Sequence, residues 1–157
     1  MGDPDARLRE LGLALPDVVP PVAAYVPAVR SGDLVWTSGQ LPMVNGQLAA
    51  TGLVGGDVDA DTAKGLARTC ALNALAAIRA EVGALSAVRR VVKVVGFVAS
   101  APGFSGQPGV VNGASELFGD VFGDAGRHAR SAIGVASLPL NAPVEVEVVV
   151  EVAAAQS

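Results

Sequence analysis

The chain has 157 residues, of which 51% are hydrophobic and 17% charged, and its formal net charge is −4. This length and composition predict one globular domain, 1–157, that can bury a core without disulfide or metal staples. The single cysteine excludes an intrachain disulfide and a cysteine-based metal site. The acidic balance, without a basic stripe, argues against nucleic acid as a partner. The N-terminus lacks the apolar run of a signal peptide, and Gly and Pro interrupt the uncharged stretches, so we expect a cytoplasmic protein with no membrane contact.

The first third of the chain predicts a helical extension followed by a hairpin. The helix is expected at about 4–15, because its leucines have helical spacing and prolines follow them. Residues 23–29 suit an extended segment, and Ser31-Gly32-Asp33 is a turn signal. The β-branched and aromatic residues of 34–38 predict the second strand of a hairpin. Residues 42–58 are rich in turn formers and are expected to form a loop.

A long helix is predicted in the middle of the chain. Asp59 or Asp61 can cap it, and it runs to about Val82, with Gly83 just past its end. Its apolar stripe consists of Leu66, Cys70, Ala74, Ala77 and Ile78. Gly65 inside this helix is expected to allow close backbone packing.

A Val-rich strand at 88–99, a helix at 110–122 and two strands at 131–136 and 144–152 complete the predicted elements. The order of elements is therefore β-β-α-β-α-β-β. This order predicts an α+β fold in which one sheet carries two helices on one face.

The last two predicted strands alternate in polarity, which separates their two faces. In the first of them, Ile133 and Val135 lie on a face suited to the core, and Arg130 lies on the other face beside small residues. In the second, valines face the core and Glu145 begins a row of glutamates on the other side. If these strands pair, Arg130 and Glu145 share the side of the sheet away from the helices.

A guanidinium beside small side chains suits a carboxylate ligand, and a nearby glutamate can exchange a proton with water. The alternative is a solvated sheet face on which Arg130 only neutralises the glutamates. His128, the only histidine, is expected on the surface or in a loop, or as a neutral hydrogen-bond donor at the mouth of the site. Cys70 is expected to be a buried small hydrophobe and Trp36 a packing residue. The glycines form no nucleophile elbow, P-loop or dinucleotide fingerprint.

Short motifs spread over nearly the whole chain carry a resemblance to a known family. They are Tyr25-Val26, Thr37-Ser38-Gly39-Gln40-Leu41-Pro42, Val111-Asn112, Ala129-Arg130-Ser131, Val135-Ala136-Ser137-Leu138-Pro139 and Glu145-Val146-Glu147. In their joint order and spacing they resemble the Rid (reactive intermediate deaminase) or YjgF family. The N-terminal helix and longer loops are similar to its RidA-like, slightly longer-chain subgroup.

The resemblance implies a chorismate-mutase-like α+β fold and a homotrimer with sites between its subunits. It implies hydrolysis of 2-imino acids, or their enamine tautomers, to 2-oxo acids and ammonia, with no cofactor and no metal. Arg130 would bind the substrate carboxylate, and Glu145 would position or activate the attacking water. The backbone at Ala132 would hydrogen-bond the imine nitrogen or the water. The residues expected to line the cleft are Tyr25, Ser38, Gly39 and Asn112.

The chain also departs from the family pattern. Familiar deaminase members have Cys in place of Ala132, Glu in place of Gly134 and Pro in place of His128. These departures predict a smaller, less polar cleft that either accepts a bulkier substrate or binds without turnover. An imine deaminase of broad specificity is the leading hypothesis, because Arg130 is kept. The alternative is a non-catalytic trimer of the same family that binds a small carboxylate or regulates another enzyme. The acidic charge and lone histidine argue against a ribonuclease or translation inhibitor.

Overall fold

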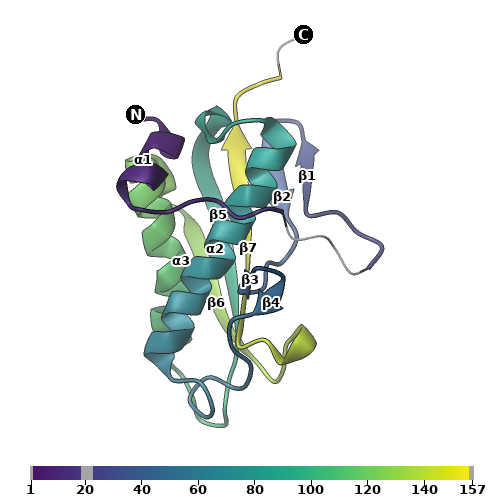
Figure 1. The fold of residues 1–157 in the computed structure, drawn as a ribbon, viewed down its shortest axis with the longest axis vertical. Helices are drawn as coiled ribbons and strands as arrows, with labels where there is room; N and C mark the ends of the chain where they lie inside the picture. Colours follow the sequence, from purple (N-terminus) through teal and green to yellow (C-terminus); the bar gives the residue numbers. More distant parts are fainter. Residues whose placement is uncertain (1, 19–22, 156–157) are drawn as a thin grey trace.

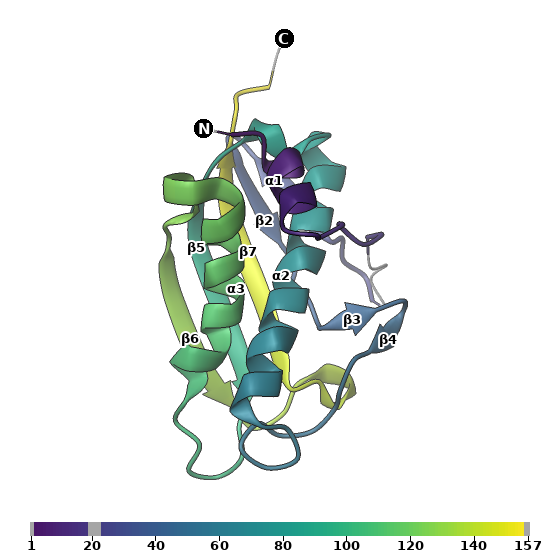
Figure 2. The ribbon, with the colours of Figure 1, turned by 60° about the vertical axis from the view of Figure 1, so that its left-hand side comes forward.

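A five-stranded sheet with two long helices packed on one face forms the fold (Figures 1 and 2). The structure, a computed structural model, describes residues 2–18 and 23–155. The strands of the sheet are β1 (Ala28–Ser31), β2 (Leu34–Thr37), β5 (Val88–Ala99), β6 (Ala129–Val135) and β7 (Val144–Val152), in the spatial order β1-β2-β7-β5-β6. The long helices are α2 (Ala60–Val82) and α3 (Gln107–Phe122). The predicted α+β class, with both helices on one side of the sheet, is confirmed.

The order of strands matters for the site at one place. β5 pairs antiparallel with β7 and parallel with β6, so it lies between them. The condition under which Arg130 and Glu145 would share a face, that β6 and β7 pair directly, is therefore not met. The cause is that β5, α3 and β6 form a β-α-β unit, in which a helical crossover returns the chain to lie parallel to the strand it left.

The described residues before α2 form two hairpins, one at the edge of the five-stranded sheet and one separate from it. Gly32 has φ 62° in the turn between β1 and β2, where the predicted turn is confirmed, although β1 begins at Ala28 and not at 23. A second hairpin joins β3 (Met43–Val44) to β4 (Gln47–Leu48), inside the segment expected to be a loop. Asn45 and Gly46 make this turn with φ 51° and 79°, the left-handed values that Asn-Gly turns adopt.

The N-terminal helix α1 (Pro4–Glu10) is shorter than the predicted helix at about 4–15. Gly12 has φ 72°, and the backbone N–H groups of Gly12 and Leu13 donate to the carbonyls of Arg9 and Leu8. These two bonds form a Schellman motif, which ends a helix at its glycine. The described residues also form three 3₁₀ turns: η1 (Leu85–Ala87), η2 (Gly123–Gly126) and η3 (Pro139–Asn141).

The two long helices approach each other closely at Gly113, not at Gly65. A Cβ on Gly113 would overlap the backbone carbonyl of Lys64, whereas nothing lies within 4 Å of a Cβ on Gly65. The expectation that Gly65 allows close packing is therefore wrong, and Gly113 of α3 has that role. The predicted cap of α2 is confirmed, because Asp59 accepts the N–H of Thr62 at 2.7 Å.

The face of the sheet away from the helices carries many apolar side chains. Val29, Trp36 and Ile133 lie on this open face and are 50%, 51% and 42% exposed. The expectation that Trp36 packs is therefore not met within one chain. On the helix side, in contrast, Cys70 and the alternate valines of β7 are fully buried, as predicted.

Candidate functional site

Arg130 lies on the helix side of the sheet. It pairs with Val94, which in turn pairs with Val148, and residues paired in this way share a face. Val94 and Val148 are buried beneath the helices. The prediction that Arg130 faces away from the helices is therefore wrong. The alternation of polarity along this strand gave the wrong face because it placed Ile133 in the core, whereas Ile133 lies on the open face.

Three protein acceptors hold the guanidinium of Arg130 against α3. Its Nη1 donates to Asn112 Oδ1 at 2.7 Å and to Ser115 Oγ at 3.3 Å, and its Nη2 donates to the carbonyl oxygen of Pro108 at 3.3 Å. A guanidinium has five N–H donors. Among residues 2–18 and 23–155, no acceptor is found for the Nε–H and one Nη2–H. These two donors sit on adjacent nitrogens and can bind both oxygens of one carboxylate.

Ala132 directs its backbone to the free edge of β6. The carbonyl of Val135 accepts the N–H of Ser100, which follows β5, at 2.9 Å. Residues of a parallel strand alternate between bonding their neighbour and pointing away from it, so the N–H and C=O of Ala132 lie on the outer edge. That edge is where the predicted hydrogen bond to an imine nitrogen or water would form.

Gly134 leaves space that an amide from α3 occupies. A Cβ at this position would lie 2.7 Å from Gln107 Nε2 and 3.1 Å from Ser100 Oγ. Gln107 Nε2 itself donates to Ser100 Oγ at 3.1 Å and to the carbonyl of Phe104 at 2.8 Å. The amide of Gln107 therefore fills the room left by the missing side chain.

Glu145 lies on the open face, against Gly39. It pairs with Phe97, which also pairs with the exposed Ile133. A Cβ on Gly39 would overlap Glu145 Oε1, so glycine is what lets the carboxyl lie there. Burial raises the pKa of the Glu145 carboxyl, and the like charge of Glu147 raises that pKa further. Glu145 therefore keeps its proton to a higher pH than an exposed glutamate, which suits proton exchange with water.

Ser38 and Tyr25 belong to the segment beside Glu145. The Ser38 hydroxyl donates to the carbonyl of Val26 at 2.6 Å, which ties the end of β2 to the residue after Tyr25. Tyr25 is 49% exposed. Gln40, two residues past Ser38, exchanges backbone hydrogen bonds with Val146. Gly39 and Gln40 thus lie against the strand that carries Glu145, and Ser38 links this segment to the residue after Tyr25.

The predicted site residues therefore form two groups. The Arg130 group consists of Arg130, Asn112 and Ala132, and the Glu145 group consists of Glu145, Gly39, Ser38 and Tyr25. β5 separates the strands that carry Arg130 and Glu145, and the two side chains project from opposite faces. The two positions are also offset by roughly 10 Å along the strands, at the usual rise per residue. One chain does not bring the two groups together.

Sequence reasoning missed Ser115 and gave His128 no firm role. His128 is half-buried, its Nε2 lies 2.9 Å from Ser115 Oγ, and its Nδ1 lies 2.6 Å from the carbonyl oxygen of Gly126. The ring also meets Phe118 edge-on. Helical spacing could have placed Ser115 beside Asn112, one turn earlier, and strand spacing could have placed His128 on the face of Arg130.

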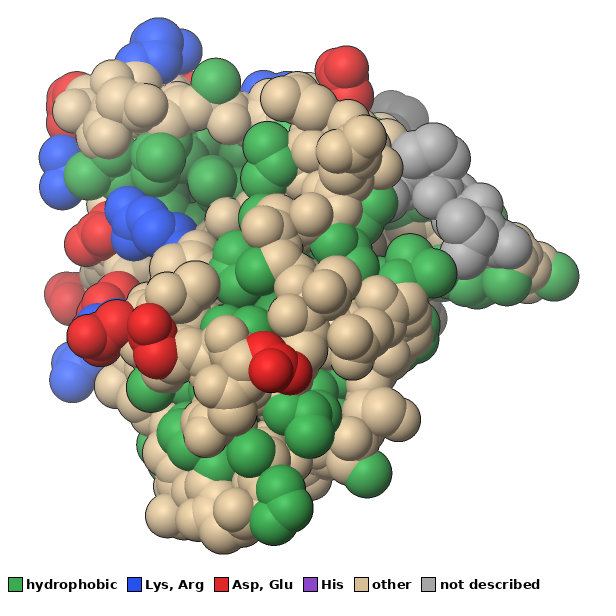
Figure 3. Space-filling view, turned by 60° about the horizontal axis from the view of Figure 1, so that its bottom comes forward, with side chains coloured by type: hydrophobic (Ala, Val, Ile, Leu, Met, Phe, Trp, Pro, Cys, Tyr) green, Lys and Arg blue, Asp and Glu red, His purple; other side chains and the backbone are tan. Residues whose placement is uncertain are grey.

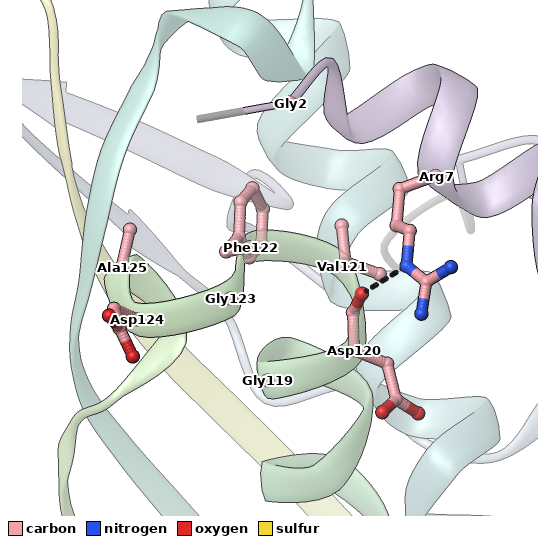
Figure 4. Close-up of a pocket in the computed structure, with 9 residues that line it drawn as sticks. All are labelled: Gly2, Arg7, Gly119, Asp120, Val121, Phe122, Gly123, Asp124 and Ala125. Atoms are coloured by element: carbon pink, nitrogen blue, oxygen red, sulfur yellow. Dashed lines mark hydrogen bonds between the residues drawn. The ribbon is translucent and has the colours of Figure 1, made fainter.

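A separate hollow of about 600 Å³ lies where α1 meets the end of α3 (Figure 4). Arg7 borders it, and its Nε donates to the carbonyl of Asp120 at 2.9 Å. None of the residues predicted to bind or convert a ligand lines this hollow.

The surface of the helix layer mixes acidic and basic side chains, as the left side of Figure 3 shows. Lys64 lies 3.1 Å from Glu116, and Arg68 lies 3.4 Å from Asp120.

In the part of the chain that the structure describes, no three His, Cys, Asp or Glu side chains gather closely enough to hold a metal ion. Over the same residues, no helix combines the length and apolar character needed to cross a bilayer.

Comparison with known proteins places this fold and these residues in a family. Residues 5–152 match the model of a family described as "YjgF/chorismate_mutase-like, putative endoribonuclease". Protein TCP17 from Trypanosoma cruzi is 44% identical over 147 residues, which cover 93% of this chain and 92% of TCP17.

Two solved structures extend the comparison. Atu1372 from Agrobacterium tumefaciens, a protein of unknown function, is 51% identical with a TM-score of 0.87, and the match covers 95% of this chain and 91% of that chain. The YjgF gene product from E. coli is 26% identical with a TM-score of 0.63, and the match covers 86% of this chain and 93% of that chain. The resemblance drawn from the sequence motifs is confirmed: the chain belongs to the YjgF/chorismate mutase-like family.

Proposed function

We propose that the protein hydrolyses small 2-imino acids to 2-oxo acids and ammonia, at a site that two copies of the chain complete. The proposal rests on the hydrogen bonding of the Arg130 guanidinium. Three of its N–H donors are fixed on α3, and the remaining two, on Nε and Nη2, are left for a ligand among the described residues. A planar carboxylate beside the reacting carbon is the ligand that such a pair of donors fits best.

The proposed reaction needs positioning and proton transfer more than strong activation, because an imine carbon is already electrophilic. Water adds to that carbon: a C–O bond forms, the C=N π bond breaks, and the nitrogen gains a proton. The hydroxyl proton of the carbinolamine then passes to the amino nitrogen, the C=O π bond forms as the C–N bond breaks with its electron pair on nitrogen, and ammonia leaves a 2-oxo acid. Arg130 holds the carboxylate throughout. Glu145 takes the proton from water and returns one to nitrogen, and the outward backbone of Ala132 orients the water or the imine.

A second copy of the chain is part of this proposal, because the Arg130 group and the Glu145 group lie on opposite faces of one sheet. The apolar open face, with Trp36 and Ile133 exposed, and the unpaired edge of β6 both favour cover by another protomer. A homotrimer, which the family resemblance implies, would set an Arg130 group of one copy beside a Glu145 group of the next at each interface.

The test is a direct rate measurement. 2-Iminobutanoate is generated in situ, and its loss is followed with and without the protein. Acceleration is expected, and Arg130→Ala should lower kcat/KM about 100-fold or more, because a bidentate charged contact is lost. Arg130→Lys should recover only part of the activity, since an ammonium cannot form the fork. Arg127→Ala is the matched control, because this exposed arginine lies three residues away and outside the Arg130 group.

The same measurement separates the enzyme from the non-catalytic alternative. If imine loss is not accelerated while 2-oxobutanoate still binds and Arg130→Ala abolishes that binding, the protein is a carboxylate-binding member of the family. If neither turnover nor carboxylate binding depends on Arg130, both forms of the proposal fail.

A further inference from the structure

A chain of hydrogen bonds runs behind Arg130, from the turn before β6 to the guanidinium. His128 Nδ1 lies 2.6 Å from the carbonyl oxygen of Gly126, and His128 Nε2 lies 2.9 Å from Ser115 Oγ. The same Oγ lies 3.3 Å from Arg130 Nη1. His128 and Ser115 are half-buried, and neither is among the residues assigned above to bind or convert the substrate.

When the imidazole of His128 is neutral, the two ends of this chain determine the direction of every hydrogen bond in it. The carbonyl of Gly126 can only accept, so His128 Nδ1 carries the hydrogen. The guanidinium of Arg130 can only donate, so Ser115 Oγ accepts from it. A neutral imidazole with its hydrogen on Nδ1 has a lone pair on Nε2, and the Ser115 hydroxyl donates to that lone pair. Each donor then has one matching acceptor.

His128 also explains why the Ser115 hydroxyl is turned toward β6. A serine inside a helix commonly donates to the carbonyl four residues earlier, which here belongs to Val111. The lone pair of His128 Nε2 draws the hydroxyl hydrogen to the other side, where Ser115 Oγ can accept from Arg130. Because an arginine side chain has many rotamers, a fixed acceptor at Nη1 restricts the orientation of the whole guanidinium.

We propose that His128 is a positioning residue for the carboxylate-binding guanidinium and that it acts through Ser115. Asn112 and Ser115 both accept from Nη1 and Pro108 accepts one hydrogen of Nη2, so the Nε–H and the other Nη2–H are the donors offered to the ligand. The inference rests on the proposed function, in that it takes Arg130 to bind the carboxylate. The inference adds that the loss of either His128 or Ser115 weakens small-carboxylate binding by the same amount.

A double-mutant cycle tests the pair, with the dissociation constant of 2-oxobutanoate measured by calorimetry. His128→Ala and Ser115→Ala should each raise Kd about fivefold to tenfold, the range expected for the loss of one ordinary hydrogen bond. The double variant should be no weaker than either single variant, because both changes break one chain. Ser115→Thr, which keeps the hydroxyl, should bind as the unchanged protein does. Thr69→Ala is the matched control, since it removes a helix hydroxyl of α2 that donates to Gly65, away from Arg130.

A spectroscopic measurement separates positioning from general loss of structure. Ring ¹⁵N shifts should show the hydrogen of His128 on Nδ1, and Ser115→Ala should move the Nε2 signal while the melting temperature stays close to that of the unchanged protein. In turnover, KM should rise and kcat should change little. If His128→Ala does not fold, the contrast between Ser115→Thr and Ser115→Ala still decides the matter.

The outcomes distinguish this inference from the proposed function. The role of His128 would be overturned if the two single variants bound 2-oxobutanoate as tightly as the unchanged protein, or if their effects on Kd added in the double variant. In either case Arg130→Ala would still lose binding. Binding that survives Arg130→Ala would instead overturn the proposed function, and the inference with it.

Discussion

Asn112 Oδ1 accepts a hydrogen bond from Arg130 Nη1 at 2.7 Å, and this bond joins the edge strand β6 to α3. The amide oxygen is neutral, so it orients the guanidinium without cancelling its charge. The positive charge of Arg130 is thereby kept for an incoming anion, and the fork on Nε and Nη2 stays open.

Replacing this neutral acceptor by a charged one should block the site. In Asn112→Asp, a carboxylate at the same place would form an ion pair with Arg130 and compete with the substrate carboxylate. We expect KM for 2-iminobutanoate to rise about tenfold or more, with little loss of stability. Initial rates over a range of imine concentrations measure the effect. An Asn112→Asp protein with an unchanged KM would show that Arg130 does not bind the carboxylate of the substrate.

Glu145 should make stability depend on pH. The pKa of its carboxyl is raised in the folded chain, first by burial and then by Glu147. Its contribution to the free energy of unfolding is therefore fully present below the ordinary glutamate pKa and is lost as the pH rises through the raised pKa. Glu145→Gln removes the ionising group, so the stability of this variant relative to the unchanged protein should increase over that pH range. Urea unfolding at fixed protein concentration measures the difference in free energy of unfolding between the two proteins. A difference that stays constant or shrinks as the pH rises would contradict the raised pKa of Glu145.

Gly113 and Gly65 should respond in opposite ways to the same substitution. Gly113→Ala would place a Cβ against the backbone carbonyl of Lys64, which cannot move without shifting α2, so we expect a loss of about 2–4 kcal/mol in the free energy of unfolding. Gly65→Ala meets open space within a helix and should gain up to about 1 kcal/mol. Thermal and urea unfolding of both variants test the close approach of the helices. Equal effects would mean that the helices do not meet at Gly113.

The amide of Gln107 should control whether a larger side chain fits at position 134. Gly134→Glu alone places its Cβ 2.7 Å from Gln107 Nε2, so it should destabilise the protein and disturb the start of α3. Combining it with Gln107→Ala vacates that space and should restore the melting temperature. Activity of the double variant then reports whether a carboxylate there, as in familiar deaminase members, improves turnover. Failure of the second change to rescue stability would show that Gln107 does not fill the space.

The parts of the fold that could be predicted are those in which local pattern and tertiary burial agree. β5 and β7 match their predicted bounds because alternate valines pack beneath the helices. α2 begins after Asp59 as predicted because a side-chain cap is a local interaction.

The face of β6 could not be predicted, because alternation separates two faces without saying which one is inner. Ile133 and Val135 look like core residues, yet the open side of this sheet is itself apolar. The link between Ser115 and His128 was also hidden, because the two residues meet only when α3 packs across β6. Arg130 was identified as the residue of interest, but its neighbours follow from the β5-α3-β6 arrangement and not from the strand in which it lies.

Mixing two inactive variants tests most directly whether two copies of the chain complete the site. Arg130→Ala and Glu145→Gln proteins are each expected to be nearly inactive. When they are dissociated together and reassembled in equal amounts, a trimer with sites between copies should recover about a quarter of the unchanged protein's activity, because about three trimers in four are mixed and each has one complete site in three. The unchanged protein carried through the same procedure sets the reference. A mixture no more active than its two components would contradict a site that joins Arg130 of one copy to Glu145 of another.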